Sequence, residues 1–336
     1  MDKYRNNSGE ITMQLPLRTT TLFKICIAIL SRYILGLGVG HLILPAQTMF
    51  KNRLPPISPR KETHGQLELS YFGVNTSDGV MLDTVEISSN PKDLNHPYVI
   101  KFCGNGMTYH QVISELVSTA EKNNATVIGF DYPNVGSSTS VRIYSQSQLV
   151  NAGIAQVQRL LDKGVNPKNI TLHGLSLGGA VATLVAAHFH QQNPPNEVYL
   201  INDRSFSSVA NAVSGFRRSA DMESIVRFAL YLLGWNMNAA DAYRKIPDTH
   251  KMIIVSKHDS VIHYRLASLY QAVKPDLKRK YADDMQDYKA VTHAYKISNG
   301  HTLDFVHGES LDSLLDKNGQ PIVLTINKFI TNKSRL

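Results

Sequence analysis

A serine stands between two glycines where one apolar segment gives way to another. The stretch reads Gly174-Leu175-Ser176-Leu177-Gly178, with an apolar run at 170–173 before it and an alanine-rich run after it. The first run predicts a short buried strand and the second predicts a helix. A G-x-S-x-G pattern at a strand-to-helix turn is typical of a nucleophile elbow, whose tight turn needs small residues on both sides of the serine. The pattern predicts Ser176 as a nucleophile and the backbone N–H of Leu177 as a donor to an oxyanion.

A nucleophilic serine needs a histidine to accept its proton, and the histidine needs a carboxylate to orient it. Two aspartates follow predicted strands, at the sheet edge where catalytic groups collect. Asp259 follows the strand predicted at 252–256, and Asp203 follows the one at 197–201. A helix N-cap is the structural alternative for Asp259, and an ion pair with Arg204 is the alternative for Asp203. Both aspartates are candidates on position alone.

The candidate base is a histidine in a loop. His301 comes directly after the last predicted strand, at 294–297, and Gly300 lets that loop carry the ring over the sheet. His293 precedes the strand and His307 lies further along, so both are expected outside the site. Because His301 is downstream of the serine and of both aspartates, its position favours it as the base.

A second oxyanion donor is expected in the loop after the strand predicted at 98–102. Asn105 is the chosen donor, since Gly104 and Gly106 on either side allow a close approach of the backbone. Cys103 in the same loop is a nucleophile in principle. A small buried apolar side chain is the alternative that its position favours.

The elements that must carry these residues alternate along the chain. Strands are predicted at 67–74, 80–87, 98–102, 126–130, 170–173, 197–201, 252–256 and 294–297, with helices at 108–121, 146–163, from 177 onward and at 322–330. The first two strands form a hairpin through residues 75–79. This alternation predicts an α/β protein with a mostly parallel sheet and helices on both faces.

The N-terminal part is organised differently. Residues 1–20 are polar and expected to be mobile, residues 21–44 are apolar, residues 45–66 form a Pro-rich linker, and residues 67–336 form the catalytic domain. For 21–44 three interpretations are open: a helix on or loosely inserted in a membrane, a helix packed on the domain, or a transmembrane span. Arg32 near the middle makes the span the least favoured of the three.

Bulk composition excludes several classes of protein. The formal net charge is +8, but the basic residues are scattered and form no face interleaved with aromatics, so no nucleic acid partner is expected. The charge is compatible with an anionic membrane surface. The two cysteines, Cys26 and Cys103, do not predict a disulfide scaffold. The 13 histidines show no metal-ligand spacing, and no metal is predicted.

An apolar segment at 222–243 follows the sixth predicted strand. A helix at 223–233 would be apolar on most of its circumference, and it is followed by Trp235. Either the helix simply covers the core, or it roofs the serine and forms a wall for an acyl chain. In the second interpretation Phe228 and Trp235 are the predicted substrate-binding residues.

Taken together, these motifs resemble the α/β-hydrolase superfamily over residues 67–330, and within it the Bem46-type serine hydrolases. The resemblance rests on Cys103-Gly104-Asn105, residues 131–138, Gly174 to Gly179, Ser205-Phe206-Ser207-Ser208, Asp259-Ser260-Val261-Ile262 and Gly300-His301. It implies the α/β-hydrolase fold with a small helical insertion after the sixth strand, and it favours Asp259 over Asp203. Cys103 stands where that family has a histidine, and His263 where it has a proline. The run from Asn202 to Ser208 is also similar to lipase-like effectors that Legionella-type intracellular bacteria inject into host cells.

The predicted function is a serine hydrolase that cleaves a carboxylic ester, of a lipid or another small ester, through Ser176, His301 and Asp259 without a cofactor. Lipase, phospholipase and lysophospholipase are the activity classes that fit. The alternatives are a non-catalytic interaction module on the same fold, and an acyltransferase or peptidase that uses the same triad. The protein is expected to associate with a membrane, and the likeness to secreted effectors suggests a location in a host cell. The alternative location is the bacterial cytoplasm.

Overall fold

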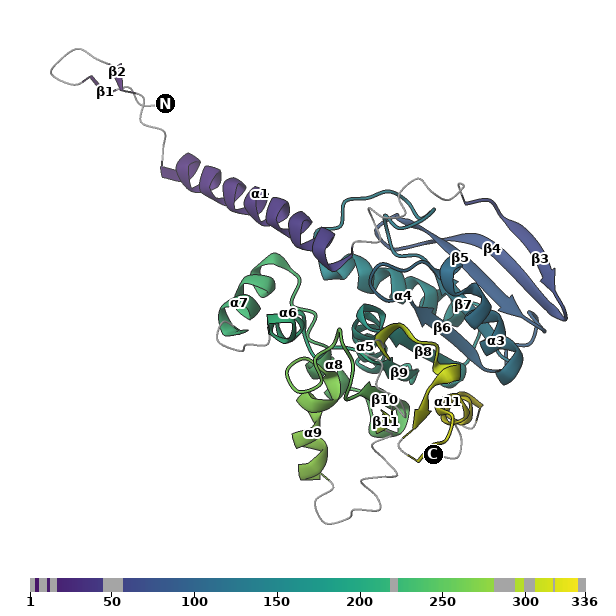
Figure 1. Cartoon of the computed structure of the whole chain (residues 1–336). Coiled ribbons are helices and arrows are strands. Elements are labelled where there is room, and N and C mark those ends of the chain that lie inside the picture. The colour runs from purple at the N-terminus through teal and green to yellow at the C-terminus, as the bar shows by residue number, and fades with distance from the viewer. Residues whose placement is uncertain are drawn as a thin grey trace.

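A ten-stranded sheet forms the centre of the described chain (Figure 1). The computed structural model describes residues 4–5, 11–12, 17–44, 57–217, 223–280, 294–298, 306–316 and 318–331. The strands are β3 (Arg60–His64), β4 (Leu67–Asn75), β5 (Met81–Ser88), β6 (Tyr98–Phe102), β7 (Thr126–Phe130), β8 (Ile170–Leu175), β9 (Tyr199–Asp203), β10 (Lys251–Ser256), β11 (Ala294–Ser298) and β12 (Leu315–Asp316). Two further short strands, β1 (Tyr4–Arg5) and β2 (Ile11–Thr12), pair with each other outside this sheet.

The strand order is β12-β11-β10-β9-β8-β6-β7-β5-β4-β3. The run from β11 to β7 is parallel, whereas β5, β4, β3 and β12 pair antiparallel with their neighbours. The strand β8 that precedes Ser176 therefore lies near the middle of the sheet, between β6 and β9. A parallel centre with this order and a serine elbow after its central strand is the α/β-hydrolase fold, as predicted.

Helices cover both faces of the sheet. One apolar cluster packs α4 (Gln146–Asp162), α5 (Leu177–His190), α8 (Ala239–Arg244) and α9 (Leu269–Lys280) against one face. A second cluster packs α3 (Ile113–Asn123) and α11 (Ile322–Thr331) against the other. The central strands are buried on both sides, which is why they read as continuous apolar runs in the sequence.

The strand β3 departs from the sequence analysis. Residues 45–66 were predicted as a linker, yet Arg60–His64 pairs with β4 as an antiparallel edge strand. Every residue of this strand is exposed, so no apolar alternation marks it in the sequence. The strand is defined by its hydrogen-bonded pairing with β4. Its charged side chains are typical of a sheet edge that is protected against pairing with another chain.

The helix α1 (Leu17–Ile43) projects from the domain and packs on it only through its C-terminal half (Figure 1). Gly36, Gly40 and the following Leu44 are buried on one stripe, whereas every residue from Lys24 to Arg32 is exposed. A Cβ atom on Gly40 would lie 2.2 Å from the carbonyl oxygen of Ile143, so only glycine allows this backbone-to-backbone contact. One of the three interpretations of 21–44, a helix packed on the domain, thus describes the C-terminal half of this helix.

The insertion predicted after the sixth predicted strand, which is β9 in the structure, is helical. It contains α6 (Val209–Arg217), α7 (Glu223–Leu233) and α8, and it lies between β9 and β10 in the chain. In Figure 1, α7 lies on the side of the domain from which α1 projects. The C-terminal end of α7 is bonded to α1, because Arg32 Nε donates to the carbonyl oxygen of Leu232 over 2.6 Å.

Candidate active site

Ser176 sits at a strained turn between β8 and α5. Its φ of 54° and ψ of −118° lie in a region that non-glycine residues rarely adopt. A Cβ on Gly174 would lie 2.2 Å from the carbonyl oxygen of Gly178, and one on Gly178 would lie 2.1 Å from that of Phe102. The two glycines therefore allow the strand and helix to meet. The Ser176 N–H donates to the carbonyl oxygen of Asp203 over 2.9 Å, which fixes the turn to the neighbouring strand.

The predicted oxyanion donors lie beside this serine. Leu177 is the first residue of α5, where a helix leaves backbone N–H groups without an intrahelical acceptor. Gly104 approaches so closely that a Cβ there would be 3.7 Å from the Cβ of Ser176. Asn105 and Leu177 both line the same cavity as Ser176. The arrangement is compatible with two backbone donors on one oxyanion.

Asp259 holds a histidine, as a catalytic acid must, and it also caps its own turn. Its Oδ1 accepts the N–H groups of Val261 over 2.9 Å and Ile262 over 2.7 Å. Its Oδ2 lies 2.8 Å from Nδ1 of His307, and the carboxylate is almost fully buried. The capping alternative is therefore present, and the same side chain also contacts a histidine. A carboxylate fixed on both oxygens can orient an imidazole and stabilise its charged form.

The histidine beside Asp259 is not the one that the sequence favoured. His301 and His293 lie outside the described residues. His307, which was expected outside the site, stands in a 3-10 turn at Val306–Gly308 and contacts the acid. That expectation was wrong because closeness in sequence to the last strand was used as the guide. The sequence did contain a signal for this alternative, because His307 also follows the last strand, six residues after His301.

Asp203 is held in the ion pair that was its structural alternative. Arg204 donates through Nε to Oδ1 over 2.8 Å and through Nη2 to Oδ2 over 3.0 Å. Burial would raise the pKa of Asp203, but the Arg204 guanidinium and His173 lower that pKa below its usual value. Arg204 also donates through Nη1 to the carbonyl oxygen of Glu309, two residues after His307. The pair therefore supports the loop that carries the histidine.

An apolar cavity of about 270 Å³ opens over the serine. Its only polar lining residues among those described are Ser176 and Asn105, and the others are Leu42, Ile43, Leu177, Phe206, Val209, Ala212, Val213, Val261 and Ile262. Asp259 lies directly behind this wall, since it accepts from the backbones of Val261 and Ile262. The helices α1 and α6 and the loop after β10 thus surround the nucleophile.

Phe228 and Trp235, the predicted acyl-wall residues, are not among the described residues that line this cavity. Phe228 is 64% exposed on the outer side of α7. Trp235 is fully buried beneath α1, and its Nε1–H donates to the carbonyl oxygen of Gly36 over 2.9 Å. Residues of α6, in the same insertion, line the cavity instead. α6 precedes the segment 222–243 that the sequence analysis selected, so the predicted acyl wall was placed too late in the insertion.

Comparison with known proteins places the chain in a family. The family model described as Chlamydia CHLPS protein (DUF818) matches residues 72–304. The chain belongs to that family. It is 30% identical over 145 residues to L404 of Acanthamoeba polyphaga mimivirus, named as a candidate alpha/beta hydrolase; the match spans 42% of this chain and 54% of L404. It is also 26% identical over 213 residues to the uncharacterized mimivirus protein R595, spanning 61% of this chain and 70% of R595.

The solved structures that the chain resembles include three proteins with low sequence identity to it. The Pyrococcus furiosus esterase Pf2001 is 17% identical, with a TM-score of 0.48 over 68% of this chain and 84% of its own. An alpha-beta hydrolase from Vibrio vulnificus is 17% identical, with a TM-score of 0.49 over 72% and 75%. An acetyl xylan esterase from Paenibacillus sp. R4 is 14% identical, with a TM-score of 0.49 over 68% and 81%.

Cys103, the competing nucleophile, is buried and protonated. Burial raises the pKa of its thiol well above the usual range, and Asp131 nearby adds to that shift. A thiol that does not ionise is a poor nucleophile. Both cysteines are free. Cys103 therefore behaves as the small buried side chain that its position favoured.

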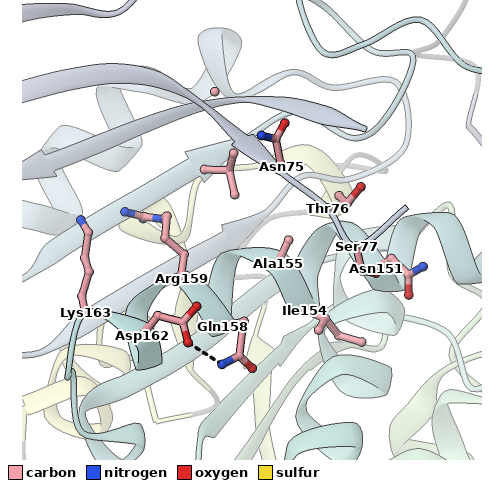
Figure 2. A pocket seen from close by; sticks show the side chains of 12 residues that line it. Asn75, Thr76, Ser77, Asn151, Ile154, Ala155, Gln158, Arg159, Asp162 and Lys163 are labelled. Carbon is pink, nitrogen blue, oxygen red and sulfur yellow. Dashed lines mark hydrogen bonds between the residues drawn. The ribbon is translucent and has the colours of Figure 1, made fainter. Parts of the chain in front are cut away.

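A larger hollow lies elsewhere on the domain. Figure 2 shows this cavity of about 640 Å³, between the turn after β4 and one side of α4. Its lining includes Asn75, Asn151, Asp162 and Lys163, but neither Ser176 nor a histidine. Lacking the nucleophile and a base among its described lining residues, this hollow does not compete with the smaller cavity as a hydrolytic site.

One group of side chains in the described part of the chain has metal-ligand geometry. Oxygen or nitrogen atoms of Asp83, His110 and Asp131 lie within 4.8 Å of one another. One oxygen of Asp131 accepts the backbone N–H of Tyr109 over 2.9 Å. Burial raises the pKa of Asp131 well above its usual value, which disfavours the charged form of this carboxyl.

Proposed function

We propose that this protein is a serine hydrolase that cleaves carboxylic esters with an apolar acyl group, of the lipase or lysophospholipase type. The observation that carries the proposal is a cavity lined by Ser176 at a strained turn and by Val261 and Ile262, whose N–H groups donate to the aspartate that contacts His307. The apolar lining suits an acyl chain, and the buried Ser176 suits attack on the carbonyl at its end. The similarity of the motifs to Bem46-type hydrolases supports the same activity.

In the proposed reaction Ser176 Oγ attacks the ester carbonyl while the histidine takes the hydroxyl proton. The N–H groups of Leu177 and Asn105 stabilise the tetrahedral oxyanion. The histidine then gives its proton to the leaving alcohol, which departs and leaves an acyl-serine. Water, deprotonated by the same histidine, releases the acid and restores the serine. Asp259 keeps the histidine in the tautomer that accepts at Nε2.

We assign the base to His307 because it is the described histidine that contacts Asp259. His301 remains the prediction of the Gly-His motif, and a pair of variants decides between them. His307→Ala should lower kcat by about a thousandfold or more, whereas His301→Ala should leave turnover within an order of magnitude. The opposite result would return the role to His301.

The nucleophile is tested by Ser176→Ala. This variant should lose hydrolysis of p-nitrophenyl butyrate and labelling by a fluorophosphonate probe while its circular dichroism stays that of the wild type. Ser205→Ala is a matched control, because this neighbouring buried serine donates to the carbonyl oxygen of Ser176 and does not line the cavity. Undiminished turnover by Ser176→Ala would end the proposal.

The cavity is tested by acyl length. Each methylene buried is worth about 0.8 kcal/mol, or roughly fourfold in kcat/KM, until the cavity is full. Across p-nitrophenyl esters kcat/KM should therefore rise from acetate to medium chains. Val213→Trp should shift the optimum to shorter chains by filling the cavity. A steady preference for acetate in the wild type would contradict an acyl site.

A location at a membrane is part of this proposal and is supported by α1. Lys24–Ile43 has a mean hydropathy of 1.7 with 11% of its length buried, and is long and apolar enough to cross a membrane. Signal sequences near an N-terminus share these properties. Delivery into a host cell, suggested by the likeness to Legionella-type effectors, stays a prediction to be tested by localising the tagged protein.

A further inference from the structure

The exposed half of α1 is rich in apolar residues, and between residues 24 and 32 only Lys24, Ser31 and Arg32 are polar. Lys24 to Arg32 has no buried residue, and Ile25, Ile27, Ile29 and Leu30 are all about half exposed or more. At 100° per residue Ile25 and Ile29 lie on one side of the helix, and Leu30 and Ile27 lie roughly 120° and 180° from them. These apolar side chains cover about half of the circumference, which is wider than the stripe of a helix that packs on a protein, and lipid matches such a surface. The whole apolar segment is about 30 Å long, the thickness of a bilayer core.

The outer face of α7 continues this apolar surface. Ile225, Phe228, Tyr231 and Leu232 are each more than half exposed, at spacings that place them on one side of the helix. Arg32 does not interrupt the surface with a bare charge, because its Nε donates to the C-terminal carbonyl of α7 at Leu232. A cation at a helix C-terminus is a favourable placement. α1 and α7 are therefore fixed to each other as one apolar unit.

This apolar surface meets the mouth of the catalytic cavity. Leu42 is 80% exposed, and it lines the cavity that contains Ser176, so it stands at the opening. Ile43 next to it also lines the cavity, and Val261 forms another exposed part of the lining. The same helix thus offers one end to lipid and forms the rim of the hydrolytic site with its other end.

We propose that α1 and the outer face of α7 insert into a lipid bilayer, and that the cavity over Ser176 opens onto that bilayer. The substrate class is then an acyl ester that resides in the membrane and enters past Leu42 without crossing water. This inference rests on the proposed hydrolase function of Ser176. The net charge of +8 favours a bilayer that contains anionic lipid.

The depth of the cavity mouth can be measured without catalysis. In full-length Ser176→Ala protein with Cys26→Ser, a Leu42→Cys or Phe228→Cys substitution carries a nitrobenzoxadiazole label; the native Cys103 is buried. Vesicles of phosphatidylcholine and phosphatidylglycerol contain a lipid with a shallow spin-label quencher. Labels at both positions should be quenched, and a label at Leu324→Cys, an exposed position on α11, should not be. Equal quenching at 42 and 324 would overturn the proposal.

A second measurement separates delivery from chemistry. Ile29→Asp with Leu30→Asp should lower hydrolysis of 4-methylumbelliferyl oleate in those vesicles by about tenfold or more, because charge in the bilayer core is costly. The same variant should keep fluorophosphonate labelling and hydrolysis of soluble p-nitrophenyl butyrate, and Leu324→Asp should keep both activities. Equal rates on vesicle ester for the double variant and the wild type would refute membrane delivery. Loss of soluble turnover in Ser176→Ala tests the hydrolase proposal separately, so the two failures are distinguishable.

Discussion

Gly40→Leu should detach α1 from the domain, because Gly40 lies directly against another backbone. A Cβ at this position would be 2.2 Å from the carbonyl oxygen of Ile143 and 3.1 Å from a ring carbon of Trp235. Ordinary contact begins at 3.4 Å, so the helix must move by about 1.2 Å before the rest of the side chain is placed. The obstacle is backbone, which no rotamer change can relieve.

The cost can be compared with what holds α1 in place. The hydrogen bond from Trp235 to Gly36 is worth about 1 kcal/mol. Complete burial of Leu44 is worth about 1.5–3 kcal/mol. Overpacking a tight contact costs about 1–3 kcal/mol, and more when backbone is involved. The substitution therefore cancels most of the docking energy, and the undocked fraction should rise by one to two orders of magnitude.

The assay is tryptophan fluorescence, because Trp235 is the sole tryptophan of the chain and is fully buried beneath α1. Gly40→Leu should shift its emission to the red and make it accessible to acrylamide. Gly38→Leu is the matched control, since a Cβ on Gly38 has no atom within 4 Å. As Leu42 and Ile43 leave the cavity, the dependence of kcat/KM on acyl length should flatten. If Gly40→Leu and Gly38→Leu show the same quenching and the same acyl preference, α1 is not the wall described above.

Three further outcomes are expected. Asp259→Asn should lower kcat by about ten thousandfold in an esterase assay, whereas Asp203→Asn should lower mainly the melting temperature. Gly178→Ala should lower kcat or prevent folding, which activity and circular dichroism together distinguish, because its Cβ would meet the Phe102 carbonyl at 2.1 Å. Burial and the Lys101 ammonium lower the pKa of His173 below 6.5, so the unfolded chain binds the extra proton first as the pH falls. Unfolding free energy should therefore decrease below about pH 6.5, and His173→Gln should reduce that slope by up to about 1.4 kcal/mol per pH unit, measured by urea titration.

Local patterns predicted the central sheet and the strand-to-helix turn at Ser176 well. The elbow needs only residues that are adjacent in sequence, and the strand before it is buried on both faces. The two glycines could be assigned because the turn excludes a side chain at each position, and the structure shows the close contacts that do so. The edge strand β3 was missed because all its residues are exposed and show no apolar alternation, and its pairing with β4 cannot be read from the pattern.

Long-range contacts decided the features that the sequence left wrong or open. Trp235 was predicted to bind substrate because its segment is apolar. Its indole N–H instead donates to the carbonyl oxygen of Gly36 in α1, 199 positions earlier in the chain. A charged Arg32 was expected to be unfavourable within an apolar helix. Its guanidinium donates a hydrogen bond to the carbonyl oxygen of Leu232 in α7. His307 could not be preferred over His301 from spacing, because its contact with Asp259 joins residues 48 positions apart in the chain.

The buried ion pair explains why two aspartates competed for one role. Asp203 accepts the Ser176 N–H with its backbone oxygen, and its carboxylate holds Arg204. Arg204 in turn binds the carbonyl oxygen of Glu309, beside the histidine that Asp259 orients. The guanidinium engages both oxygens of this carboxylate, so the Asp203–Arg204 pair fixes distances within the site. Asp203 thus links the turn that carries Ser176 to the segment that carries His307, while Asp259 contacts His307 itself.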